Sequence, residues 1–254
     1  MKADFVWEDF NRPELKLLRN RYGLEKVVSS GKDKFEKQLL LKKWVFATLP
    51  LGYNNTNQYR SALEVLDDQE NKGGFNCSWY VLVYLQCAIT LGWYVRKLGI
   101  DTDHDFGEEE MRHTVVDIWS KKHKKWFVID PMFNAHFEKD GTPLNSHEVR
   151  KHYLNGEKVK KVFGNYEQEI LSEKVKERND NPNNYFWFFI LLRNNYLVNP
   201  DVYDSKALLW MDEYNKDKTW HVGGRNKGEF KRHPMYEGAF IETNDYSLCF
   251  PTMV

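Results

Sequence analysis

The stretch Gly73-Gly74-Phe75-Asn76-Cys77 decides the fold, because a glycine-rich break is followed at once by a thiol and a long apolar segment. Apolar residues then recur at three- and four-residue steps, as expected for a buried, central helix: Tyr80, Val81, Tyr84, Leu85, Ala88 and Leu91. The free N–H groups and the dipole at a helix start favour a thiolate, and the same N–H groups could face a developing oxyanion. The pattern therefore predicts Cys77 as a nucleophile, with a small buried core residue as the alternative.

A second pattern follows in two short segments that read as a β-hairpin. Residues 112–119 alternate in polarity, residues 125–130 are apolar, and the link between them is polar. A turn centred between Lys121 and Lys122 would place His113 directly opposite Asp130, on one face of the sheet. A carboxylate in that position can orient an imidazole. The alternative is two unrelated polar residues in a sheet.

The two patterns together predict a catalytic site. A thiolate nucleophile needs a base, and the base needs a group that orients it. Cys77 on a helix, with His113 and Asp130 on adjacent strands, meets this requirement.

These segments also resemble a known family. The motif ending in Cys77, the helix that follows to Leu98-Gly99-Ile100, and the segments 112–119 and 125–131 are similar to the transglutaminase-like superfamily. This superfamily contains transglutaminases, peptide N-glycanases and bacterial transglutaminase-like cysteine proteases, and it is related in fold to papain-like enzymes. The chain looks most like the bacterial members. The resemblance covers residues 77–134, and more weakly 34–156.

The resemblance implies a role for each of the three residues. Cys77 would be the nucleophile, His113 the general base and acid, and Asp130 the group that orients His113. The implied fold is α+β, with a papain-like or transglutaminase-like core in which a central helix bearing the cysteine packs on an antiparallel sheet bearing the histidine and aspartate.

The rest of the chain is expected to extend this core. Ser29-Ser30 could cap a helix that ends before Pro50, and residues 60–71 and 145–155 also read as helices. The residue composition changes near residue 164, and beyond it the segments 185–192 and 207–211 look like buried strands. We therefore expect a catalytic core over 1–163 and a β-rich extension over 164–254 that packs on it.

Composition excludes several classes of protein. The formal net charge is zero, so neither nucleic acid nor a membrane is an expected partner. No apolar run reaches the roughly 20 residues that span a bilayer, and three cysteines do not make a disulfide framework. The sequence predicts no cofactor and no metal site, since zinc spacing and a phosphate loop are missing and the acidic loop at 101–110 does not match a calcium loop. The N-terminus lacks an apolar signal region, so we expect a cytoplasmic protein, or an exported one whose signal has been removed.

The expected activity is hydrolysis of an amide or peptide bond through an acyl-enzyme thioester, with a peptide, a protein or another amide-containing molecule as substrate. Two alternatives stay open: an acyl transferase that uses an amine acceptor, and an inactive member of the fold that binds peptide or glycan. A second oxyanion donor could come from Trp44, Asn57 or Gln58. The sequence predicts no oligomeric state.

Overall fold

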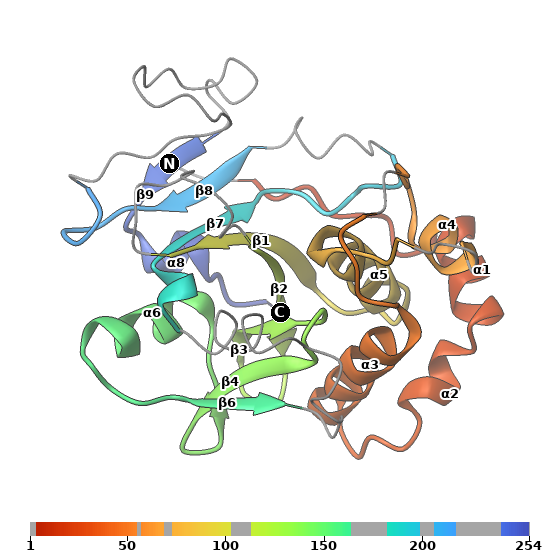
Figure 1. The fold of residues 1–254 in the computed structure, drawn as a ribbon, viewed down its shortest axis with the longest axis horizontal. Coiled ribbons are helices and arrows are strands. Elements are labelled where there is room, and N and C mark those ends of the chain that lie inside the picture. The colour runs from red at the N-terminus through yellow and green to blue at the C-terminus, as the bar shows by residue number, and fades with distance from the viewer. Residues whose placement is uncertain are drawn as a thin grey trace.

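The computed structural model describes residues 4–54, 57–68, 73–102, 113–163, 182–198, 206–216 and 240–253. A large mixed sheet runs through the middle of the molecule in the order β5-β4-β3-β2-β1-β7-β8-β9, and β6 pairs with β4 (Figure 1). Neighbouring strands of the sheet are antiparallel, except that β8 and β9 are parallel to each other. The strands are β1 (Val95–Asp101), β2 (His113–Ser120), β3 (Lys125–Asp130), β4 (Ala135–Lys139), β5 (Thr142–Pro143), β6 (Lys160–Phe163), β7 (Trp187–Leu191), β8 (Ala207–Trp210) and β9 (Phe240–Thr243).

Helices lie on both sides of this sheet. The combination of these helices with a mostly antiparallel sheet makes the protein α+β, as predicted. Figure 1 shows α1 to α5 gathered at the right, and α6 and α8 at the left. The helices are α1 (Pro13–Arg21), α2 (Leu24–Val28), α3 (Lys34–Thr48), α4 (Ala62–Asp67), α5 (Cys77–Thr90), α6 (Ser146–Leu154) and α8 (Tyr246–Cys249), with a 3-10 helix at Pro182–Tyr185. No helix within the described ranges is long and apolar enough to cross a lipid bilayer.

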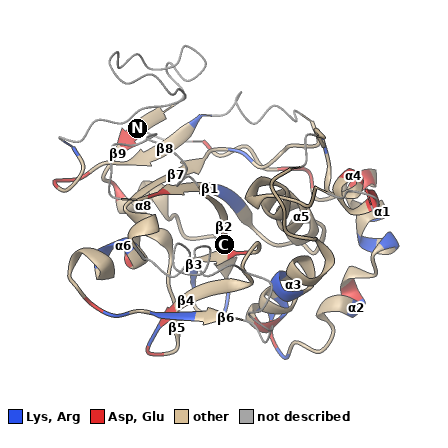
Figure 2. Ribbon diagram, viewed as in Figure 1, with Lys and Arg blue, Asp and Glu red and all other residues tan. Residues whose placement is uncertain are grey.

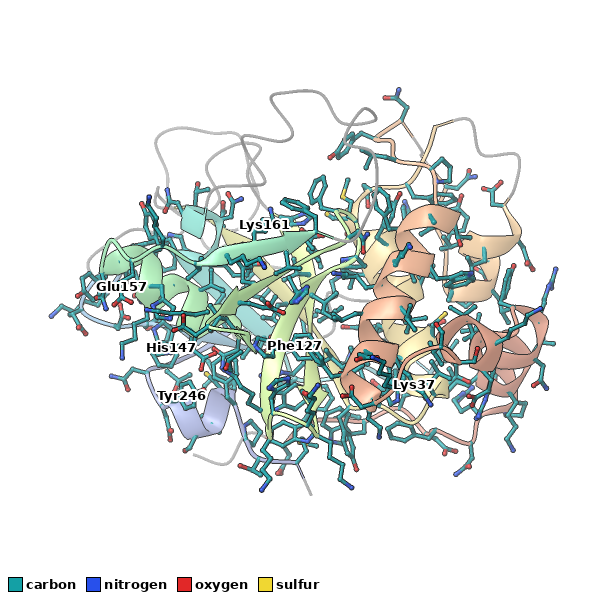
Figure 3. The ribbon with its side chains drawn as sticks, turned by 90° about the horizontal axis from the view of Figure 1, so that it is seen from below. Lys37, Phe127, His147, Glu157, Lys161 and Tyr246 are labelled. Carbon is teal, nitrogen blue, oxygen red and sulfur yellow. The ribbon has the colours of Figure 1, made fainter. Side chains whose placement is uncertain are left out.

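The sheet separates two apolar layers, because successive side chains of a strand point to opposite faces. Val116 and Phe127 join the layer with α1 to α5, whereas Val115 and Val128 join the layer with α6 and α8. In Figure 3, Phe127 lies between the sheet and α3, and His147 and Tyr246 lie together beyond the sheet. The ring centroids of His147 and Tyr246 are 5.2 Å apart.

Side-chain caps fix where the main helices begin. The Asn76 side chain accepts a hydrogen bond from the Ser78 N–H and so starts α5 at Cys77. The prediction of Ser29-Ser30 as a cap was wrong. Asp33 caps α3 through the Glu36 N–H, and Ser29 ends α2 instead.

The hairpin forms as predicted, but its register differs by two residues. Trp119 pairs with Trp126, not with Lys124. The turn takes four residues, Lys121 to Lys124, and Lys124 has a left-handed φ of 52°. A shift of two residues leaves every side chain on its predicted face, so His113 and Asp130 are diagonal neighbours and not directly opposed.

Two further regions refine the predictions. Helix α5 ends at Thr90, and the chain to Ile100 forms strand β1 and not the remainder of the helix. Beyond residue 182, β7 and β8 match the predicted strands, and β7 pairs with β1, so they continue the same sheet. The expected boundary after residue 163 and the acidic residues 103–110 lie outside the described residues, so the division into two domains stays a prediction.

Candidate active site

Main-chain hydrogen bonds hold the segment before Cys77 in place. The Phe75 N–H donates to the Pro50 carbonyl at 2.8 Å, and the Gly52 N–H donates to the Phe75 carbonyl at 3.2 Å. The Tyr80 hydroxyl donates to the Leu49 carbonyl within the core. The loop that follows α3 therefore fixes the start of the helix that carries Cys77.

This contact explains the glycine-rich break. Gly74 has a φ of +69°, which glycine adopts without strain. A Cβ at Gly74 would lie 2.5 Å from the Gly52 backbone, and a Cβ at Gly52 would lie 2.0 Å from the Gly73 oxygen. Only glycines allow two backbone segments to approach this closely.

His113 and Asp130 meet at the ends of two neighbouring strands. His113 Nε2 lies 2.8 Å from Asp130 Oδ2. The other carboxylate oxygen, Oδ1, accepts the N–H groups of Met132 and Phe133 at 3.1 and 3.2 Å. The turn after β3 thus fixes the carboxylate, and the carboxylate fixes the imidazole with its Nδ1 free to face another group.

Cys77, the first residue of α5, acts on the same imidazole, because Cys77 and His113 each shift the other's pKa. Burial raises the pKa of the thiol, but the hydrogen bond and positive charge of His113, the Thr114 N–H and the charge of Lys97 outweigh burial and lower the pKa to about 7. A thiol at the start of α5 is therefore substantially a thiolate near neutral pH. The structure thus brings His113 and Asp130 into contact, and the pKa shift of Cys77 puts its thiol within electrostatic reach of His113.

The pKa of the His113 imidazole is shifted upward, opposite to that of the Cys77 thiol. Burial lowers the pKa of His113, but the charge and hydrogen bond of Asp130, together with Cys77, raise the pKa to about 10. Between about pH 7 and pH 10 the arrangement therefore favours a thiolate next to an imidazolium. Such a pair can attack a carbonyl carbon and then donate a proton.

A donor for an oxyanion is available at the same place. The Cys77 N–H, at the first position of α5, has no acceptor among the described residues, whereas the next three N–H groups donate to Asn76. The predicted second donors lie in other surroundings. The Trp44 ring packs on Tyr22, and the Asn57 amide donates to Asp68. Gln58 is exposed.

A row of hydrogen-bonded polar side chains lies buried near Asp130 and was not predicted. Lys42 Nζ is 3.2 Å from His136 Nδ1, and His136 Nε2 is 2.9 Å from Glu138 Oε1. Burial lowers the pKa of Lys42 to about 7, although the charges of Asp130 and Glu138 act in the opposite direction. Lys42 is thus a buried amine within electrostatic reach of the carboxylate that holds His113. The position of Lys42 in the sequence of α3 does not predict this burial, since a lysine in an amphipathic helix is ordinarily exposed.

The other two cysteines are in different environments. Cys87 and Cys249 are fully buried, and burial raises the pKa of both thiols, that of Cys249 to about 12. Both are packing residues, as the sequence predicts.

Comparisons with known proteins add little to this description. No family model matches the chain, and no curated protein matches it. Among solved structures, the chain is similar to a crystal structure of a "putative cysteine protease" from Cytophaga hutchinsonii, with 14% identity and a TM-score of 0.37. The match covers 49% of this chain and 39% of that one, so the chain spans about two fifths of the structure it matches.

Proposed function

We propose that this protein is a cysteine-dependent hydrolase that cleaves an amide or peptide bond through a thioester on Cys77. The observation that carries the proposal is the 2.8 Å contact between His113 Nε2 and Asp130 Oδ2, together with a Cys77 thiol whose pKa His113 lowers to about 7. Its electrostatics support the same role, because they stabilise the charged forms that nucleophilic attack needs.

The geometry suggests how each group acts. The Cys77 thiolate attacks the carbonyl carbon, and the oxyanion faces the Cys77 N–H at the start of α5. His113 then gives its proton to the leaving nitrogen as the C–N bond breaks. In the second half, His113 takes a proton from water, which attacks the thioester and releases the acid. Asp130 keeps the ring in position and stabilises its protonated form throughout.

The same thioester allows a second outcome. An amine in place of water would give acyl transfer, with the residues in the same roles. Hydrolysis is the main proposal because it needs only water, whereas transfer also needs a site that holds an acceptor and excludes water.

The test compares the wild type with Cys77→Ala on a library of peptides and peptide amides. Cys87→Ala is the matched control, since it removes a thiol from the same helix. We expect hydrolysis by the wild type and the control, no turnover by Cys77→Ala, and a mass increase on the peptide containing Cys77 when the reaction is quenched in acid. An added primary amine reports the fraction of transfer. Equal product formation by the wild type and Cys77→Ala would disprove the proposal.

A further inference from the structure

Lys97 is a half-buried lysine in β1, on the face of the sheet that carries Val95 and Val116 and packs against α5. It pairs with Val116 of β2, and Thr114 lies two residues along β2 on the same face. Diagonal neighbours of this kind are within reach of a long side chain. The Thr114 N–H and the charge of Lys97 both lower the pKa of the Cys77 thiol. Burial lowers the pKa of Lys97 itself, and the charge of Cys77 acts in the opposite direction. Figure 2 shows the basic part of β1 next to the uncharged helix α5.

Lys97 has no carboxylate partner within the part of the chain that the structure describes, and in this it differs from its neighbours. Arg96, the preceding residue, points to the other face and pairs with Asp117 at 2.9 Å. Arg150, also buried, pairs with Asp212. An anionic partner stabilises a lysine that is even partly buried, because removing its charge from water is unfavourable.

The charges at the site change during the proposed reaction. Before attack, the thiolate interacts electrostatically with both His113 and Lys97. When the S–C bond forms and the C–N bond breaks, the proton of His113 leaves with the amine, and the sulfur becomes part of a neutral thioester. Asp130 still faces His113, but Lys97 has lost the anion beside it. A carboxylate on the bound acyl group would replace that anion.

We propose that Lys97 forms an anion subsite next to Cys77 that selects amide substrates whose acyl portion carries a carboxylate. The inference rests on the proposed function, because it assumes that an acyl group occupies Cys77. An acidic residue on the acyl side of the scissile bond has this chemistry.

The first test uses two small reagents of similar size, anionic iodoacetate and neutral iodoacetamide. In both, the Cys77 thiolate displaces iodide, so their rate ratio reports the local potential independently of thiolate content. We expect Lys97→Met to lower the iodoacetate-to-iodoacetamide ratio by about tenfold, as one charge at short range does. Lys97→Arg should retain the ratio, and Lys16→Met, which removes an exposed lysine on α1, should leave it unchanged.

The second test uses peptide chloromethyl ketones that differ only in Glu or Gln at the residue bearing the ketone. The wild type should label faster with Glu, and this preference should decrease with added salt and disappear in Lys97→Met. Because the wild type alone shows the preference, this test does not depend on the variant folding.

The outcomes separate the two proposals. If Cys77 reacts rapidly with both small reagents but neither ratio responds to Lys97→Met, the anion subsite is wrong and the hydrolase proposal stands. Equal labelling of the wild type by the Glu and Gln reagents also overturns the subsite. If Cys77 reacts no faster than a free thiol, both proposals are overturned.

Discussion

Replacing His113 with Gln should change the pH dependence of Cys77 alkylation in a defined way. The substitution removes the two largest influences that lower the thiol pKa, while burial, which raises it, remains. We therefore expect the pKa to rise from about 7 to at least the ordinary value of 9.0. At pH 7 the thiolate fraction then falls from about one half to about one hundredth. A thiolate of higher pKa is intrinsically more nucleophilic, by roughly tenfold for two units, so the rate at pH 7 falls only about fivefold.

The same reasoning predicts that the two pH profiles cross. Near pH 10 both thiols are mostly ionised, and the variant should react roughly tenfold faster than the wild type, with equal rates at about pH 8. The assay is iodoacetamide labelling over pH 5–10, with peptide mapping to assign the label to Cys77. A variant whose profile keeps the wild-type midpoint near pH 7 would refute the role of His113 in forming the thiolate.

Three further changes test the structure around the site. Gly74→Ala should lower the free energy of unfolding in urea by about 3 kcal/mol or more, because residue 74 has a positive φ and lies against the Gly52 backbone. Gly92→Ala has a similar φ but open space around it, so it should lose only about 1–2 kcal/mol. Equal losses in the two variants would contradict the backbone contact. Arg96→Met should lower the free energy of unfolding by about 3–5 kcal/mol, because it leaves Asp117 buried and unpaired, and adding Asp117→Leu should restore most of this loss. A double variant as unstable as the single one would contradict a role for the unpaired charge. Burial lowers the pKa of Lys42 to about 7, so above pH 7 the folded state binds fewer protons than the unfolded state. The free energy of unfolding of the wild type should therefore rise relative to that of Lys42→Met between about pH 7 and pH 10. Parallel stability curves for the two proteins would contradict this.

The predicted parts of the fold depend on local patterns. The apolar periodicity after Cys77 predicts α5, and the two short segments with a polar link predict the hairpin of β2 and β3. The register was wrong by two residues because the turn is longer than assumed. The side-chain period of a strand is two, so this error still left His113 and Asp130 on one face. A slip of one residue would have separated them.

The parts that were not predicted depend on contacts between distant segments. Strand β1 is buried on both faces, so its apolar residues do not alternate with polar ones and the segment did not read as a strand. Lys97 and Lys42 reach the site only through the pairing of β1 with β2 and the packing of α3 near β3 and β4. Sequence spacing contains no information about either approach.

The way the loop after α3 meets the start of α5 has a consequence for engineering. Main-chain atoms of Pro50, Gly52 and Asn54 make this contact, whereas the Leu51 side chain packs against the core beside α5. The Tyr53 side chain is 62% exposed. The exposed positions Tyr53 and Asn54, with Leu51 and the two glycines kept, therefore form a compact target for a saturation library. Such a library would diversify the protein surface near the thiol while leaving the thiol itself in place.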